Sequence, residues 1–203
     1  TPAAATLDAG SAAGHRAAMQ QPGRFDFASF DGRRIAVHTL GEGRPTLLLH
    51  GFLASARLNW FEPGIAEAVA AAGRRVIAPD LRGHGESDAP AEPDAWSPDT
   101  LARDQAALVA RLGLVDYDLV GYSLGARTAV RAMVGGLRPA RVVLGGMGES
   151  GVLQAGARAA MFEDSIRNGE AARDPRAGKY IRRIMAERGL SADAMLGVLA
   201  QFV

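Results

Sequence analysis

Short apolar runs of strand type alternate with segments of helical periodicity up to about residue 148. Residues 24–30 and 34–40 are predicted to form two strands around Asp31–Gly32, a strong hairpin signal. Further strands are expected at 46–50, 75–78, 117–120 and 141–144, and helices at 63–72, 97–112 and 124–134. Such alternation predicts an α/β fold, a mostly parallel sheet with helices on both faces.

Two local signals set the expected helix boundaries. Ser97–Pro98 is typical of an N-cap followed by a first-turn proline, and Ser191 is expected to cap the last helix. Ile65 is expected on the inner face of the first helix, which Gly73 should end. The Gly-, Pro- and Asp-rich stretch at 80–93 is predicted to be a loop.

The alternation stops near residue 149, after which three helical stretches follow without a strand, at 154–167, 178–188 and 191–202. We interpret residues 149–203 as a helical cap over the edge of the sheet. Residues 24–148 then form the core, and the Ala-rich residues 1–23 a flexible N-terminal arm. The expected sheet lacks the C-terminal strands that would follow the cap.

The amino-acid composition excludes several classes of function. The chain has 203 residues, with 23 basic and 22 acidic side chains, a net charge of +1 and no cysteine. This balance gives no reason to expect nucleic acid as a partner, and the missing cysteine excludes disulfides, thiolate metal sites and a cysteine nucleophile. Neither a run of about 20 apolar residues nor a signal-peptide pattern is present, so we expect a cytoplasmic protein without membrane association.

Ser123 lies within Gly121-Tyr122-Ser123-Leu124-Gly125, which fits the G-x-S-x-G pattern of a nucleophile elbow. The chemistry needs a serine hydroxyl on a sharp strand-to-helix turn, and glycines two before and two after leave room for it. The pattern alone is weak, but here it follows an apolar strand and opens a helix. An idle serine in a glycine-bounded turn is the alternative.

Two further loops carry residues of interest. Phe52, in His50-Gly51-Phe52, is expected to donate its N–H to an oxyanion hole together with Leu124. The second loop runs from Asp80 to Ser87 and contains Arg82, Gly83 and His84. We favour a bracing role for His50 and for this loop, and keep His84 as an alternative base.

These three motifs stand in the order and spacing of the α/β-hydrolase superfamily. The chain resembles the branch that contains esterases, cofactor-free haloperoxidases and C–C bond hydrolases, over about residues 25–147. The resemblance implies that Ser123 is the nucleophile, that Phe52 and Leu124 supply the oxyanion donors, and that a helical cap begins near Glu149. Serine at the elbow argues against epoxide hydrolases and dehalogenases, which place aspartate there.

The sequence departs from that family in its histidines. The family's triad runs nucleophile, acid, histidine, whereas His15, His38, His50 and His84 all precede Ser123. We therefore expect the base beyond residue 203, in a longer protein, and expect the 203 residues alone to be nearly inert. Glu149 is a candidate acid in a variant arrangement, or an ordinary loop glutamate. An open sheet edge suggests a homodimer or a complementing chain segment.

The leading hypothesis is a serine hydrolase that acts on small, largely apolar carboxylic esters through an acyl-enzyme, with no cofactor and no metal. The alternatives are a C–C bond hydrolase, a lactonase or perhydrolase, and a non-catalytic protein that holds a small molecule. Four apolar residues of the expected cap would line the substrate pocket or pack among themselves: Met161, Phe162, Ile184 and Met195.

Overall fold

The computed structural model describes residues 22–149 and 154–202. The expected N-terminal arm lies outside the described residues except for its last two, and Gly23 already belongs to the first strand. Residues 150–153, where the expected cap would begin after Glu149, also lie outside them.

A six-stranded sheet forms the centre of the structure, in the order β1-β2-β4-β3-β5-β6. Strands β1 and β2 form the expected hairpin, and β2 also pairs antiparallel with β4, whereas the other pairs are parallel. The prediction of a mostly parallel sheet is thus confirmed. The strands are β1 (Gly23–Ala28), β2 (Arg34–Leu40), β3 (Arg44–Leu49), β4 (Arg74–Pro79), β5 (Asp118–Tyr122) and β6 (Arg141–Gly145).

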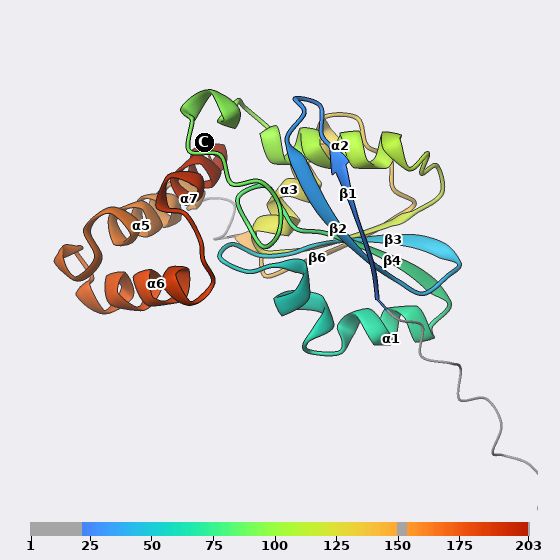
Figure 1. The fold of residues 1–203 in the computed structure, drawn as a ribbon, viewed down its shortest axis with the longest axis horizontal. Coiled ribbons are helices and arrows are strands. Elements are labelled where there is room, and N and C mark those ends of the chain that lie inside the picture. The colour runs from blue at the N-terminus through green and yellow to red at the C-terminus, as the bar shows by residue number, and fades with distance from the viewer. Residues whose placement is uncertain (1–21, 150–153, 203) are drawn as a thin grey trace, which may run out of the picture.

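Helices cover both faces of this sheet, as Figure 1 shows. Alternate side chains of β3 point to opposite faces. Leu48 packs in a cluster with residues of α1 (Ile65–Ala71), whereas Leu47 and Leu49 belong to a larger cluster with α2 (Thr100–Arg111) and α3 (Leu124–Val134). The sheet is therefore the middle layer of three, and the carboxyl ends of its parallel strands meet at one edge.

Beyond that edge lie three helices, drawn in orange and red in Figure 1, which we call the helical segment: α5 (Ala155–Asn168), α6 (Pro175–Glu187) and α7 (Ala192–Leu199). Short turns follow two of them, η3 (Gly169–Ala171) and η4 (Ala200–Phe202). Helix α7 packs on the core, where a Cβ at Gly197 would lie 2.4 Å from the ring of Trp96. Trp96 ends the short 3-10 helix η2 (Pro93–Trp96).

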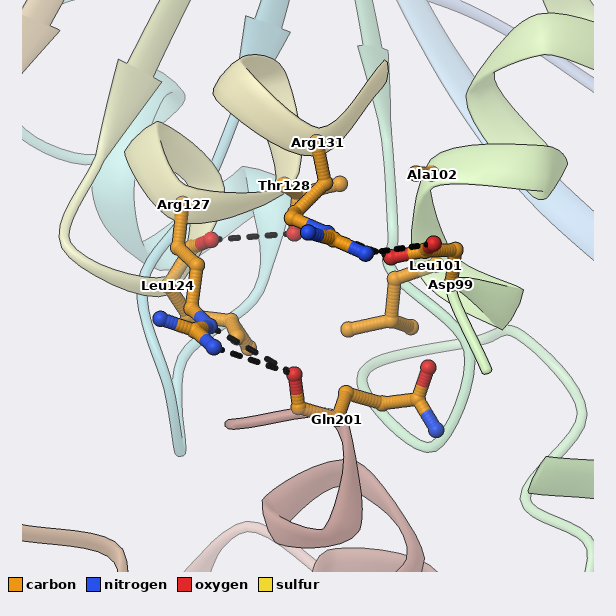
Figure 2. A pocket seen from close by; sticks show the side chains of 8 residues that line it. All are labelled: Asp99, Leu101, Ala102, Leu124, Arg127, Thr128, Arg131 and Gln201. Atoms are coloured by element: carbon orange, nitrogen blue, oxygen red, sulfur yellow. Dashed lines mark hydrogen bonds and ion pairs between the residues drawn. The ribbon is translucent and has the colours of Figure 1, made fainter. Parts of the chain in front are cut away.

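The last described turn fastens the segment to α2 and α3. The side-chain oxygen of Gln201 accepts a hydrogen bond from the Thr100 N–H at 2.9 Å, and its amide nitrogen donates to the Trp96 carbonyl. Thr100 is the first residue of α2, and its preceding residue Asp99 makes no side-chain cap. Gln201 therefore gives a second acceptor to the Thr100 N–H, which also donates to the Ser97 carbonyl at 3.1 Å. In Figure 2, Arg127 points to the Gln201 carbonyl.

Two helix starts differ from the prediction. Helix α2 begins at Thr100 instead of Ser97, because Asp99 takes a left-handed conformation with φ 59° and turns the chain first. Helix α6 begins at Pro175 instead of residue 178, because the Asp174 carboxylate caps it by accepting from the N–H groups of Arg176 and Ala177. The Ser191 cap of α7 is confirmed, since its hydroxyl accepts from the Ala194 N–H.

Other differences are smaller. The expected inner residue Ile65 is 42% exposed, since α1 is short and contacts the sheet through Ala66, Val69 and Ala70. A five-residue π-helix, η1 (Arg57–Phe61), precedes α1 where no helix was expected. The hairpin loop takes the residues after Ala28, so β1 ends two residues earlier than predicted.

Strand β6 lies at the edge of the sheet, where three apolar side chains are exposed: Val142 at 38%, Val143 at 60% and Leu144 at 40%. Such an edge has backbone groups available for pairing and apolar surface available for contact. Within the described residues no further strand pairs with β6.

Candidate active site

Ser123 lies at the turn between β5 and α3, with φ 53° and ψ −111°. Few non-glycine residues adopt such a conformation, and they are concentrated at functional sites, because the surrounding structure must hold them there. Its N–H donates to the Gly145 carbonyl at the end of β6 at 2.8 Å, and its carbonyl accepts from the Arg127 N–H. Its hydroxyl has no hydrogen-bond partner among the described residues.

The glycines of the motif allow β5, α3 and β3 to approach closely. A Cβ at Gly121 would lie 2.5 Å from the Gly125 carbonyl oxygen, and a Cβ at Gly125 would lie 2.0 Å from the Leu49 carbonyl oxygen. Real Cβ atoms do not approach that closely. Glycine at both positions is therefore a steric requirement of this turn.

The loop at residues 51–54, after β3, lies beside Ser123. A Cβ placed on Gly51 would lie 3.6 Å from the Cβ of Ser123. The Gly51 N–H donates to the Asn59 side chain at 2.8 Å, and the Gly51 carbonyl accepts from the Ala54 N–H at 3.3 Å. Leu53, in the same loop, has φ 59°, a left-handed conformation that is unfavourable for a residue with a Cβ.

The Phe52 N–H has no hydrogen-bond partner among the described residues. Leu124 is the first residue of α3, and the N–H groups of a helix's first turn have no acceptor within the helix. Two donors thus remain free on the two loops that meet at Ser123, which is the chemistry an oxyanion hole requires. The ring of Phe52 stacks edge-on against Phe162 of α5, with centroids 5.0 Å apart.

His50 and His84 are fully buried and use both ring nitrogens. His50 Nε2 accepts from the Leu81 N–H at 2.9 Å and its Nδ1 bonds the Gly51 carbonyl at 2.8 Å. His84 Nε2 accepts from the Leu53 N–H and its Nδ1 bonds the Arg82 carbonyl, both at 3.2 Å. A ring that accepts at Nε2 and donates at Nδ1 must be neutral. Both histidines therefore have a structural role, holding neighbouring loops together.

The pKa values of both histidines agree with neutral rings. Burial lowers the pKa of His50, and burial together with the nearby His50 lowers the pKa of His84 to about 3. The two ring centroids are 5.1 Å apart. His84 therefore has neither a free nitrogen nor the basicity that a general base at neutral pH requires.

Asp80 joins the ends of three segments. Its carboxylate accepts from the N–H groups of Ala56 and Glu86, both at 2.8 Å, and contacts His38 Nε2 at 3.2 Å. Burial by itself raises the pKa of Asp80, but the hydrogen bonds outweigh it, so the pKa lies below its usual value. The carboxylate is therefore a structural acceptor that stays ionised. Gly85 leaves room for it, because a Cβ there would lie 2.2 Å from Asp80 Oδ2.

Arg82 is a fully buried charge of this region, with a side chain that is 0% exposed. It pairs with Asp104 of α2 at 2.7 Å and with Asp31 of the hairpin loop at 2.6 Å, and it donates to the Ala95 carbonyl. The neighbouring Gly83 contacts α7, where its Cβ would lie 3.2 Å from Met195. The loop from Asp80 to Ser87 thus holds the hairpin, α2 and the helical segment together.

The acid and base of a triad are not found beside Ser123 in the described residues. Glu149 is exposed and makes no hydrogen bond or ion pair with them, so its role as an acid stays a prediction. His38, His50 and His84 are all bonded elsewhere, and His15 lies outside the described residues. In the same part of the chain no group of acidic, histidine or cysteine side chains could hold a metal ion.

The apolar residues expected to line a pocket lie in different surroundings. Met195 is 0% exposed and Ile184 is buried in the main core, so both pack inside the protein. Phe162 contacts Phe52 and Met161 is 41% exposed. Phe162 thus touches the loop beside Ser123.

Three contacts of the site had no signal in the sequence. They are the Asn59 side chain on Gly51, the Gly145 carbonyl on Ser123 and the Arg188 guanidinium, which donates to the Leu53 carbonyl. Each partner is a common polar group, and each except Asn59 lies far in sequence from the residue that it contacts. Only the fold brings them to this place.

The hollow shown in Figure 2 lies between α2, α3 and η4. It has a volume of about 10 Å³, room for little more than one water molecule, and it is lined in part by Asp99 and Arg131, which form an ion pair at 2.6 Å. A larger hollow of about 310 Å³ lies between η2, α5 and α7, next to Trp96 and Leu196. Ser123 lines neither of them.

Comparison with known proteins matches residues 45–134 to the family model described as the alpha/beta hydrolase fold. The matched segment contains the loop at 51–54, Asp80 to Ser87 and the serine turn. With the sheet order above, the match shows that the chain has the alpha/beta hydrolase fold.

Among curated relatives, the AB hydrolase superfamily protein YisY of Bacillus subtilis is 38% identical over 49% of this chain and 35% of its own length. Epoxide hydrolase 2 of Siraitia grosvenorii is 35% identical over 50% of this chain and 31% of its own length. The chain thus spans about a third of the length of these relatives. The esterase of Exiguobacterium antarcticum, a solved structure, covers 87% of this chain and is itself covered over 72%, with a TM-score of 0.62 and 21% identity. That likeness shows the fold.

None of the described helices is long and apolar enough to cross a membrane.

Proposed function

We propose that this chain carries the nucleophile and oxyanion hole of a serine hydrolase that acts on small, largely apolar carboxylic esters. One observation carries the proposal. Ser123 stands in a strained turn, its hydroxyl free of partners in the described residues, beside two loops whose Phe52 and Leu124 amides are also free. Free donors at the place where negative charge develops are what acyl transfer needs.

The steps follow from this geometry. The Ser123 oxygen attacks the ester carbonyl, and its proton passes to a base. The carbonyl electron pair moves to oxygen, where the Phe52 and Leu124 N–H groups bind it. The alcohol leaves with a proton, and water then attacks the acyl-enzyme and releases the acid. The apolar preference rests on the Phe52 and Phe162 rings above the site.

The base is proposed to be a histidine outside the described residues, since the three described histidines are bonded elsewhere. The exposed edge of β6 supports this proposal, because the Gly145 carbonyl at its end holds the Ser123 N–H. A segment that pairs with β6 would bring its own side chains near Ser123. It would come from further residues of the same protein or from a second chain. A cytoplasmic location stays a prediction.

Epoxide hydrolysis is a less suitable reaction for Ser123, although an epoxide hydrolase is among the relatives. A carboxylate that opens an epoxide forms an ester, which water can hydrolyse at the carbonyl. A serine hydroxyl would form an ether, which has no carbonyl for water to attack. The serine therefore favours a substrate that itself contains the carbonyl.

The test uses the protein with whatever residues follow Val203. A fluorophosphonate probe should label Ser123, and Ser123→Ala should abolish labelling, whereas Ser97→Ala, a serine on the outer loop, should not. A panel of p-nitrophenyl esters and β-diketones then gives the substrate class. Diketone turnover without ester turnover would favour C–C bond hydrolysis. An unlabelled Ser123 would favour a protein that only holds a ligand.

A further inference from the structure

Arg188 links the helical segment to the loop beside Ser123. It follows the last residue of α6, and its guanidinium donates a hydrogen bond to the Leu53 carbonyl, 135 residues away in sequence. In the described residues this is the polar bond between α6 and the loop at 51–54. A further contact from the segment is the edge-on stacking of Phe162 against Phe52.

Leu53 needs to be held from both sides. Its left-handed conformation, with φ 59°, places its Cβ in an unfavourable position, so a free loop would relax toward ordinary backbone angles. The Leu53 N–H is held by His84, and the Leu53 carbonyl by Arg188. The two bonds fix both peptide planes that flank Leu53.

The direction of the Phe52 N–H depends on this conformation. Gly51 is held at its N–H by Asn59 and at its carbonyl by His50 and Ala54, so the loop is fixed at its start. Its other end is fixed at Leu53. Between these anchors, the Phe52 N–H is the amide of the loop that has no partner in the described part of the chain. The Phe52 N–H lies in the same planar peptide group as the Gly51 carbonyl, and the Ala54 N–H that donates to this carbonyl at 3.3 Å lies in the same peptide group as the Leu53 carbonyl. Release of the Leu53 carbonyl would loosen the Ala54 amide and, through it, the peptide that carries the Phe52 N–H, and oxyanion stabilisation is steep in donor geometry.

We propose that Arg188 is a positioning residue for the oxyanion hole: its bond to the Leu53 carbonyl holds the loop in the strained shape that aims the Phe52 N–H at the reacting oxygen. The catalytic consequence rests on the proposed hydrolase function. The helical segment then has a second role beside covering the site, because moving α6 would loosen the donor.

Two substitutions and a control test this proposal on the full protein. Arg188→Met keeps the length of the side chain and removes its donors, whereas Arg188→Lys keeps one donor. The matched control is Arg183→Met, on the exposed face of the same helix, where Arg183 pairs with Glu187 and lies over Tyr180. Thermal unfolding of all three should stay close to that of the unsubstituted protein.

The first measurement does not depend on activity. Hydrogen exchange of the Leu53 amide, followed by NMR, should be about tenfold faster or more in Arg188→Met, intermediate in Arg188→Lys and unchanged in Arg183→Met. Exchange of the Ala56 amide, which Asp80 holds, should be equal in all of them. An unchanged Leu53 amide in Arg188→Met would overturn the proposal.

The second measurement tests how well the oxyanion hole stabilises the transition state. For a p-nitrophenyl ester, Arg188→Met should lower kcat about tenfold or more with little change in KM, because the lost interaction exists in the transition state. A trifluoromethyl ketone, whose adduct with Ser123 carries an oxyanion, should bind more weakly by a similar factor. Arg188→Lys should recover part of both.

Faster Leu53 exchange with unchanged kcat would also overturn the proposal. If the unsubstituted protein neither hydrolyses esters nor binds the ketone, the hydrolase function fails, and Leu53 exchange still decides what Arg188 holds.

Discussion

The Nε2 atom of His84 accepts a hydrogen bond from the backbone N–H of Leu53 at 3.2 Å. Through it, the loop that follows β4 holds the strained loop that follows β3, and both lie on the same edge of the sheet as Ser123. A protonated ring could not accept this bond, since both nitrogens would carry hydrogen. The stability of the site is therefore linked to pH.

Acidification should destabilise the protein from about pH 6.5 downward. The folded protein holds the pKa of His84 at about 3, below the 6.5 of an exposed histidine, so the unfolded chain binds protons first. The contribution of His84 to the free energy of unfolding is therefore fully present above pH 6.5 and is lost as the pH drops toward 3. His84 alone should cost about 2 kcal/mol at pH 5, and His50 acts in the same direction.

Urea unfolding at pH 7.5, 6 and 5 measures this effect. The carboxylates with lowered pKa values, Asp80 and Asp31, titrate below this window, so they do not obscure it. His84→Gln keeps an acceptor for Leu53 without a titrating ring, and its unfolding free energy should fall less between pH 7.5 and 5. Equal slopes for the two proteins would contradict the assignment.

Gly125→Ala should destabilise the protein by about 3 kcal/mol and abolish activity, because the new Cβ would lie 2.0 Å from the Leu49 carbonyl oxygen and force α3 away from β3. Gly156→Ala is the matched control. It lies in α5 with nothing within 4 Å of the new Cβ, and alanine favours the helix, so it should stabilise by about 0.5–1 kcal/mol. Thermal unfolding of the two variants checks the pair. A stable, active Gly125→Ala would show that the turn is looser than described.

Ser123→Gly should be more stable than Ser123→Ala by about 1 kcal/mol, although both lose the nucleophile. Glycine adopts φ 53°, ψ −111° at little cost, whereas alanine keeps the strain of the serine. The greater freedom of glycine in the unfolded chain offsets part of this gain. Chemical denaturation of the two variants side by side gives the difference. If Ser123→Ala proves the more stable, the turn carries no strain.

Arg82→Met should lower the free energy of unfolding by about 3–5 kcal/mol, because it leaves the Asp104 carboxylate buried without its partner. Arg82→Met combined with Asp104→Leu removes both charges and should recover much of that loss. Arg103→Met, which removes a cation lying 3.7 Å over the Phe30 ring at the surface, should cost less than about 1 kcal/mol. Equal losses for Arg82→Met and the double variant would show that the unpaired Asp104 carboxylate is not the cause of the loss.

The order of the elements, the serine turn and the loop positions could be predicted from the sequence because each depends on local chemistry. Apolar runs mark buried strands, and glycines two residues either side of Ser123 mark the sharp turn. Helix α3 was predicted with its observed bounds, Leu124–Val134. The start of α2 at Thr100 could not be predicted, because it depends on the left-handed turn at Asp99 and on Gln201, a second acceptor for the Thr100 N–H that lies about a hundred residues away.

The sequence by itself determined that a serine would be presented on an α/β sheet, since local turns and periodic burial decide that much. Only the tertiary structure decided which groups surround it: Asn59 on Gly51, Gly145 on Ser123, and Arg188 on Leu53. The physical reason is that a hydrogen bond is specific in space but not in sequence. Any arginine can donate to any carbonyl, and packing of the helical segment against the core selects the pair.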